Sequence, residues 1–320
     1  MSRMADMTGK PLRLGTRRSA LAMAQSGHVA AAVTELTGRE VELVEITTYG
    51  DTSREHLAQI GGTGVFVSAL RDALLEGSVD FAVHSLKDLP TADPEGLSLA
   101  AVPLRQDPRD ALIARDGLTL GELPAGSRIG TGSPRRAAQL RALGLGHEIV
   151  PIRGNVDTRI KFVTSGELDA VVLAKAGLAR LGRAEEATEV LDPLQMLPAP
   201  GQGALAVECA SSDASLVELL GVLDDPGTRG AVLAERMLLA ELEAGCSAPV
   251  GALADVSAGE SDGEEVTELY LRAIVASADG AHSVRLSATG PLDEAASLGR
   301  SLAAEMLARG AAGLMGERVP

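Results

Sequence analysis

The sequence predicts a mixed α/β protein, with two α/β domains followed by a small α+β domain. The chain has 320 residues, of which 45% are apolar, so it can enclose two or three hydrophobic cores. Apolar strands alternate with amphipathic helices from Leu12 to Val83, and the alternation begins again after Asp107. After Pro226, a long helix, two strands and a final helix are typical of an α+β domain.

The first α/β domain begins after a polar tail. Ser19 is a good N-cap for a helix that runs to about Leu36, and Gly38 closes this helix. The pattern predicts strands at 12–15, 41–47 and 79–83, and a second helix at 65–75.

The second α/β domain repeats this alternation. Strands are expected at 111–114, 127–130, 148–152 and 169–173, and helices at about 134–143, 155–164 and 175–181. Residues 197–203 have the composition of a linker, and the strand after them can return to the first sheet. We therefore expect residues 1–103 with 204–221 to form domain 1, 104–203 to form domain 2 and 222–320 to form domain 3.

In the third domain, a helix is expected at 228–244, with Gly245 as its C-terminal cap. Strands are expected near 268–276 and 283–288, and a final helix runs from Asp293 to about Arg309. The Glu- and Gly-rich segment 258–268 is expected to be a surface loop.

Composition excludes several classes of function. Aromatic residues are 2% of the chain and the net charge is -15, which argues against a nucleic-acid or membrane partner. The five histidines are scattered and no Cys-x-x-Cys pair occurs, so no metal site is expected. Arg17-Arg18 looks like a twin-arginine signal, but Gln25, Ser26 and His28 interrupt the apolar stretch too early. We expect a cytoplasmic protein.

The two cysteines have different contexts. Cys209 ends an apolar strand, where a small buried residue is the ordinary interpretation. Cys246 follows a helix C-terminus, whose negative dipole end disfavours a thiolate. A thiol that is alkylated once and kept as an attachment point fits this position better than a reusable nucleophile.

Residues 84–90, His-Ser-Leu-Lys-Asp-Leu-Pro, follow a buried strand at the place where open α/β sheets bind ligands. Ser85, Lys87 and Asp88 bring a hydroxyl, an ammonium and a carboxylate close together. The spacing equally allows a capping box between Ser85 and Asp88, with Lys87 in solvent.

Positive charge is concentrated in the second domain. Between Ser127 and Arg183 ten Lys or Arg stand against four Asp or Glu, inside a chain of net charge -15. Ser133 is expected to cap a helix whose first turn carries Arg135 and Arg136, and Arg159 follows the mouth of the next helix. Each arginine alone is more often a surface charge, but two clusters at helix mouths favour a site for a small polyanion.

Six segments together resemble one family, the porphobilinogen deaminases, also called hydroxymethylbilane synthases. The segments are Thr16–Ala22, Val83–Pro90, Ile129–Arg136, Arg153–Arg159, Leu197–Gly203 and Glu243–Cys246. They occur in family order, from about residue 12 to 254. The resemblance implies two lobes like those of periplasmic binding proteins, with an active cleft between them, and a third domain carrying the cofactor-attachment cysteine.

The resemblance also implies an activity and its residues. Cys246 would carry a dipyrromethane cofactor through a thioether, and four porphobilinogen molecules would condense onto this primer with loss of ammonia. Asp88 would be the catalytic acid/base and would stabilise the developing cation. Cofactor-binding residues would be Lys87, Ser133, Arg135 and Arg136, and substrate-binding residues would be Arg17, Ser19, Ser85, Arg153, Arg159 and Gln202.

The sequence departs from the family pattern in two places. The loop 57–64 has no lysine where relatives often have one, and Gly132 and Pro134 replace the commoner Ser and Leu. Two other functions remain open from the residues alone: a two-lobed solute-binding protein with an inert Cys246, and a transferase with a cysteine nucleophile. The family resemblance favours a monomer.

Overall fold

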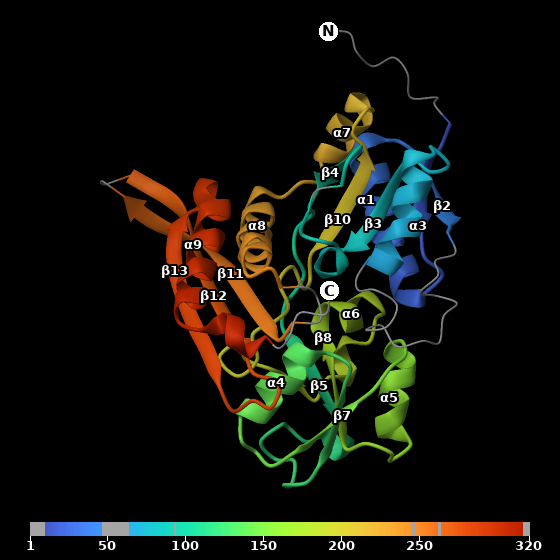
Figure 1. The fold of residues 1–320 in the computed structure, drawn as a ribbon. Helices are drawn as coiled ribbons and strands as arrows, with labels where there is room; N and C mark the ends of the chain where they lie inside the picture. Colours follow the sequence, from blue (N-terminus) through green and yellow to red (C-terminus); the bar gives the residue numbers. More distant parts are fainter. Residues whose placement is uncertain (1–9, 47–63, 93, 245–247, 262–263, 316–320) are drawn as a thin grey trace. The chain divides into compact units, whose positions relative to one another are not determined.

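The computed structural model describes residues 10–46, 64–92, 94–244, 248–261 and 264–315. These residues form two compact units. Unit 1 contains Met1–Arg105 and Ala204–Arg229, and unit 2 contains Gln106–Gly203 and Gly230–Pro320. Each unit contains one five-stranded α/β sheet, and unit 2 also contains a three-stranded sheet (Figure 1). The expected mixed α/β class is confirmed.

The sheet of unit 1 has the strand order β2-β1-β3-β10-β4. Its strands are β1 (Leu12–Thr16), β2 (Val41–Glu45), β3 (Phe81–Ser85), β4 (Leu97–Ala101) and β10 (Leu205–Ala210). β1 is parallel to both β2 and β3, while β10 is antiparallel to β3 and β4. The expected return of the strand after the linker to the first sheet is confirmed.

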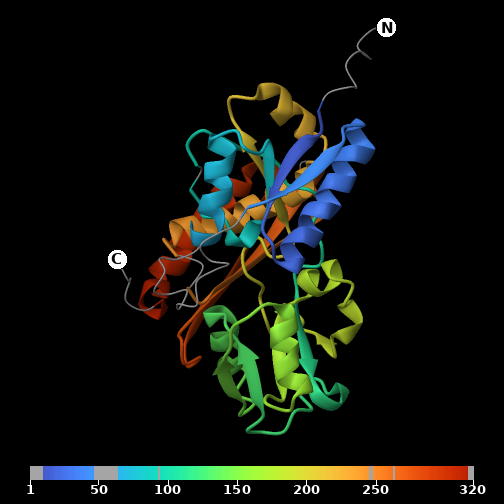
Figure 2. The ribbon, with the colours of Figure 1, turned by 90° about the vertical axis from the view of Figure 1, so that its right-hand side faces the viewer.

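Helices cover both faces of this sheet, and Figure 2 shows α1 and α3 on its opposite sides. On one face, α1 (Ala20–Thr37) and α7 (Ala214–Gly221) pack against Phe81 and Cys209. On the other, α3 (Gly64–Leu75) packs against Ala82 through Leu70. The central strand β3 is therefore buried on both faces, and it begins with the apolar run Phe81, Ala82 and Val83. Cys209 is fully buried, as expected, and its burial raises the pKa of the thiol to about 11.

The sheet of unit 2 repeats this topology with the order β7-β6-β8-β5-β9. Its parallel strands are β6 (Arg128–Thr131), β7 (Glu148–Pro151) and β8 (Ala170–Ala174); β5 (Asp110–Ala114) is antiparallel to β8 and pairs with β9 (Glu189–Val190). The connecting helices are α4 (Pro134–Ala142), α5 (Val156–Thr164) and α6 (Lys175–Arg180). The expected helices and strands of this region are confirmed within a few residues.

The C-terminal part of unit 2 is a meander, β11 (Val250–Ser261), β12 (Glu264–Ala276) and β13 (Ser283–Pro291), all antiparallel. The helices α8 (Pro226–Glu241) and α9 (Ala295–Ala308) share one core with these strands. A smaller cluster joins Leu253 and Ile274 of the meander to Ala138 of α4. The second and third expected domains therefore lie in one compact unit.

Two expectations about this region are wrong. Residues 258–268 are not a loop, because β11 and β12 stay paired as far as Ser261 and Glu264. The helix α8 ends at Glu241, before the expected end at residue 244, and Glu243 after it is left-handed, with φ 49°. The backbone reverses there because Ala244 N donates to Leu239 O. Gly245 and Cys246 lie outside the described residues.

Short 3-10 turns complete the fold: Leu86–Asp88, Arg115–Gly117, Ala184–Glu186, Leu292–Glu294 and Ala311–Leu314. Across the ranges described above, no helix combines the length and the apolar character that a membrane span requires. In the same ranges, no three His, Cys, Asp or Glu side chains are grouped so that they could hold a metal ion.

Candidate active site

A pocket in unit 1 lies where β1 and β3 end. Because these strands are parallel neighbours, the segments after them meet at one edge of the sheet. The segment after β1 contributes Arg17, and the 3-10 turn after β3 contributes Asp88. The pocket is lined by the polar residues Arg17, Gln25, His84, Ser85 and Asp88 and by the apolar residues Ala22, Val67, Leu70 and Val83.

The side chain of Ser85 does not cap the 3-10 turn that follows β3. Ser85 makes no side-chain capping bond, so the alternative of a capping box is wrong for this residue. Its hydroxyl oxygen instead accepts a hydrogen bond from Gln25 Nε2 at 2.8 Å. Asp88 is exposed in the pocket wall, and Lys87 beside it is half-buried.

A buried ion cluster supports the pocket from the side of α3. The carboxylate of Glu208 on β10 accepts two hydrogen bonds from Arg71, at 2.7 and 3.1 Å, and its Oε2 lies 3.1 Å from His84 Nε2. Burial by itself would raise the pKa of Glu208, but His84 and Arg71 outweigh this effect and lower the pKa to about 2. The ionised carboxylate of Glu208 therefore lies beside His84 in the pocket wall.

The other expected residues of unit 1 have separate tasks. The Ser19 hydroxyl accepts from Ala22 N at 3.2 Å, so it is the N-cap of α1, as expected. Ser19 does not line the pocket, whereas Arg17 does. The structure therefore brings Arg17, Ser85 and Asp88 together and leaves Ser19 in the helix start.

In unit 2 the corresponding edge carries the remaining expected residues. Ser133 caps α4 by accepting from Arg136 N, and Asn155 caps α5 by accepting from Thr158 N. Gly132 stands between β6 and this cap, where a Cβ atom would lie 2.6 Å from Ile152 O. The departure from serine at this position thus fits the close approach of the β7 end. Arg153, also at that end, is exposed.

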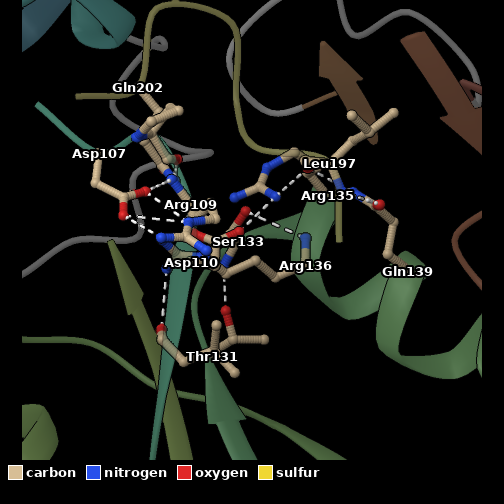
Figure 3. A network of polar contacts seen from close by, with 12 residues as sticks. Asp107, Arg109, Asp110, Thr131, Ser133, Arg135, Arg136, Gln139, Leu197 and Gln202 are labelled. Atoms are coloured by element: carbon tan, nitrogen blue, oxygen red, sulfur yellow. Dashed lines mark hydrogen bonds and ion pairs between the residues drawn. The ribbon is translucent and has the colours of Figure 1, made fainter. Parts of the chain in front are cut away.

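Asp110 organises the centre of this edge (Figure 3). Its carboxylate is fully buried and accepts from Arg135 Nη1 at 2.8 Å and from Arg136 Nε and Nη2 at 3.0 and 2.8 Å. Gln202 Nε2 donates to the same carboxylate at 2.8 Å. Burial alone would raise the pKa of Asp110, but the two guanidinium groups hold it well below its usual range.

Around Asp110 positive charge exceeds negative charge. Burial, and then the nearby charge of Arg136, lower the pKa of Arg159. Arg180 is buried, its Nη2 donates to Gly203 O at 2.6 Å, and burial lowers its pKa to about 10. Within the described ranges, neither Arg159 nor Arg180 forms an ion pair with a carboxylate. Desolvated cations in excess are what a polyanionic ligand requires.

Sequence reasoning missed four residues here: Gln25, Asp110, Arg180 and Glu208. Asp110 opens a strand at the ligand edge of its sheet, and this position could have singled it out. Arg180 is one of the ten basic residues between Ser127 and Arg183, and nothing in its local sequence distinguishes it from the others. Gln25 was noted only as an interruption of an apolar stretch, and Glu208 only as part of the strand ending at Cys209.

Two family descriptions match the chain. "Porphobilinogen deaminase, dipyromethane cofactor binding domain" matches residues 12–218, and "Porphobilinogen deaminase, C-terminal domain" matches residues 230–308. The chain belongs to the porphobilinogen deaminase family. It is 68% identical to "Porphobilinogen deaminase 1" of Streptomyces avermitilis and of Streptomyces coelicolor, in each case over 98% of this chain and 99% of the relative.

A further relative agrees with this membership in the porphobilinogen deaminase family. "Porphobilinogen deaminase" of Nocardia farcinica is 59% identical over 98% of this chain and 90% of its own length. Among solved structures, a periplasmic substrate-binding protein of an ABC transporter from Coxiella burnetii is similar at a TM-score of 0.43 and 14% identity, over 68% of this chain and 94% of that chain.

The residues present fit the dipyrromethane cofactor named in the family description. Each pyrrole of such a group carries two carboxylates, and the edge of unit 2 around the single buried carboxylate of Asp110 offers the guanidinium groups of Arg135, Arg136, Arg159 and Arg180. One donor is conspicuous: Arg135 Nε is buried and has no hydrogen-bond partner among the residues that the structure describes. Ser133, Arg135 and Arg159 are therefore suitable donors for the carboxylates of this group.

Proposed function

We propose that this protein is a porphobilinogen deaminase, which joins four porphobilinogen molecules head to tail with loss of ammonia and releases the linear tetrapyrrole hydroxymethylbilane. The observation that carries this proposal is the 68% identity, over nearly the full chain, to two relatives named porphobilinogen deaminase 1. When bound, the dipyrromethane supplies the primer to which the first substrate ring is joined.

In this proposal the pocket of unit 1 holds the reacting ring. The apolar side chains of Val67 and Leu70 supply a wall against which a pyrrole can pack, and Asp88 supplies a carboxylate at the rim. As ammonia leaves, positive charge develops on the substrate ring, and the carboxylate of Asp88 stabilises that charge. Arg17 pairs with a substrate carboxylate.

The guanidinium groups of unit 2 bind the carboxylates of the growing anionic chain. Ser133, Arg135 and Arg136 serve the cofactor, together with Lys87, while Arg153, Arg159 and Gln202 serve the substrate with Ser19 and Ser85. The buried Arg180 joins this set. Support comes from the excess of cations over carboxylates around Asp110 and from the burial that lowers the pKa of Arg159 and Arg180.

Cys246 is the attachment point in this proposal. Cys209 is a poor alternative, because it is fully buried and its thiol has a pKa of about 11. We also propose that the enzyme acts as a monomer, which the family resemblance favours, and that it acts in the cytoplasm, which the early interruption of the apolar stretch after Arg17-Arg18 favours.

The test is the intact mass of the denatured protein, produced in a host that makes porphobilinogen. We expect an adduct of two pyrrole units, mapped to Cys246 and absent from a Cys246→Ser variant, and release of ammonia from added porphobilinogen. We expect Asp88→Asn to keep its thermal stability and to lose ammonia release by about two orders of magnitude or more. A protein that carries no adduct and acquires none from porphobilinogen would instead support the solute-binding alternative.

A further inference from the structure

The inference concerns which edge of Arg135 is available to a ligand, and why. Arg135 Nη1 donates both to Asp110 Oδ2, at 2.8 Å, and to Leu197 O, at 2.6 Å. These two bonds use both hydrogens of Nη1. In the described residues Nε has no partner although it is buried, and no bond is found from Nη2.

The free edge has the geometry of a carboxylate receptor. The Nε–H and Nη2–H groups of a guanidinium are parallel, and together they bind one carboxylate through two bonds. A buried donor without a partner is costly, so this edge is stable only if something else fills its hydrogen bonds. The side chain of Arg135 is 4% exposed, so bulk water is a poor substitute.

Arg136 differs from Arg135, because its own Nε and Nη2 already donate to Asp110 Oδ1 and its Nη1 donates to Val172 O at 3.0 Å. Gln202 adds a further bond to the same oxygen. Oδ1 of Asp110 therefore accepts from Arg136 and Gln202, while Oδ2 accepts from Arg135 and holds it in place (Figure 3).

We propose that Asp110 is a positioning residue for the dipyrromethane cofactor: by holding Arg135 at Nη1, it presents the Nε–Nη2 edge of Arg135 to one cofactor carboxylate. This inference rests on the proposed function and adds to it the residue that orients the donor. Arg136 and Gln202 serve to hold Asp110 in place.

The first experiment measures cofactor loading, not turnover. Full-length apoprotein from a host without porphobilinogen is incubated with increasing porphobilinogen, and the loaded fraction is read by intact mass. We expect Asp110→Asn to need about 10- to 100-fold more porphobilinogen for half-maximal loading, because a bond to a charged group is lost from the receptor. Loading of Asp110→Asn at the wild-type concentration overturns the proposal.

A double-mutant cycle separates positioning from a general structural effect. Arg135→Lys removes the bidentate edge, so it should impair loading about as strongly as Asp110→Asn. If Asp110 acts through Arg135, Asp110→Asn should cause less than about a threefold further loss in the Arg135→Lys background. Losses that multiply in full show that Asp110 acts elsewhere and overturn the proposal.

Glu189→Gln is the matched control, since Glu189 is a carboxylate of the same unit that accepts from Leu120 N at 2.6 Å. We expect it to load like the wild type. If the wild type itself fails to load, the proposed function is lost; if the wild type loads and the cycle is multiplicative, only the present inference is lost.

A measurement on the wild type covers the case in which Asp110→Asn does not fold. In protein labelled with 15N-arginine, the Nε–H resonance of Arg135 is assigned by its absence from Arg135→Lys. We expect this resonance to shift, and its hydrogen exchange to slow about tenfold or more, when the cofactor is loaded. An Arg135 resonance that is the same before and after loading overturns the proposal.

Discussion

Side chains at the two sheet edges differ in how far along the sequence their hydrogen-bond partners lie. Ser19, Ser133 and Asn155 each accept from a backbone N–H three residues ahead, so a short stretch of sequence predicts them as caps. Asp110 and Arg136 are 26 positions apart, and Arg71 and Glu208 are 137 apart. No periodicity of the sequence indicates such pairs, which depend on the order of strands in the sheet.

The same distinction explains the expected anion site. Two arginines at a helix start do predict a concentration of positive charge. Whether their guanidinium N–H groups are free to bind a ligand depends on Asp110, which the strand order of the sheet places next to them. The sequence therefore predicts the residue types of the site, while the division of their donors between protein and ligand follows from the fold.

Glu208 gives a prediction about pH. Its pKa is lowered from 4.5 to about 2, so its ionised form stabilises the folded state above about pH 4.5, and this contribution is lost as the pH falls toward 2. We expect Glu208→Gln to reduce the free energy of unfolding by about 3 kcal/mol at pH 7, because Arg71 loses a buried counter-charge. Urea unfolding measured from pH 7 to about pH 3 should show the two proteins converging.

The control for this series is Asp80→Asn. Asp80 directly precedes β3, and its carboxylate, which is more exposed than that of Glu208, pairs with Arg13 at 2.7 Å. Its effect at pH 7 should be smaller, about 1 kcal/mol or less. A constant difference between wild type and Glu208→Gln across the whole pH range contradicts the assignment.

Among elements, the C-terminal meander shows where sequence patterns fail. Residues 258–268 are rich in Glu and Gly, and yet 258–261 belong to β11 and 264–268 belong to β12. Backbone hydrogen bonds between two strands do not require apolar side chains on either face. A segment with the composition of a loop can therefore form a two-stranded ribbon. The end of α8 is similar, because Glu243 adopts the left-handed conformation that was expected at a glycine.

The contact between α8 and α9 gives a second prediction. A Cβ atom at Gly299 of α9 would collide with Ala234 O and lie 3.0 Å from Leu238 N, both on α8. We expect Gly299→Ala to lower the free energy of unfolding by about 1–3 kcal/mol, because the two helices must separate. Thermal and urea unfolding measure this change.

Gly27 provides the control within another helix. It lies inside α1, and a Cβ atom there would meet no neighbouring atom within 4 Å. The same substitution, Gly27→Ala, should therefore raise the free energy of unfolding by up to about 1 kcal/mol. If both alanine variants change stability in the same direction, close packing at Gly299 is not the cause.

At the scale of the whole molecule, the chain order of unit 1 is interrupted. β10 lies between β3 and β4, although residues 106–203 belong to the other unit. The linker composition of residues 197–203 made this return predictable. The division into units was harder to foresee, because α4 and the meander share apolar contacts that no composition change marks.

The central place of β10 predicts how pieces of unit 1 behave. A fragment of residues 1–105 lacks the partner of both β3 and β4, so we expect no cooperative thermal transition by circular dichroism. A chain of residues 1–229 with a short Gly-Ser linker in place of 106–203 should fold, since Gln106 N donates to Gly203 O and the two ends are adjacent. Cooperative melting of the 1–105 fragment alone would contradict this account.

The same insertion determines when the first sheet can be completed during synthesis of the chain. A ribosome that adds about 5–20 residues per second must still translate the roughly 100 residues between β4 and β10 after β4 is made. For about 5 to 20 seconds, the nascent first sheet has an open edge on β3, with the unpaired N–H and C=O groups that attract foreign strands. The newborn chain is therefore most exposed to aggregation, and most in need of a chaperone, in the interval before residue 210 leaves the ribosome.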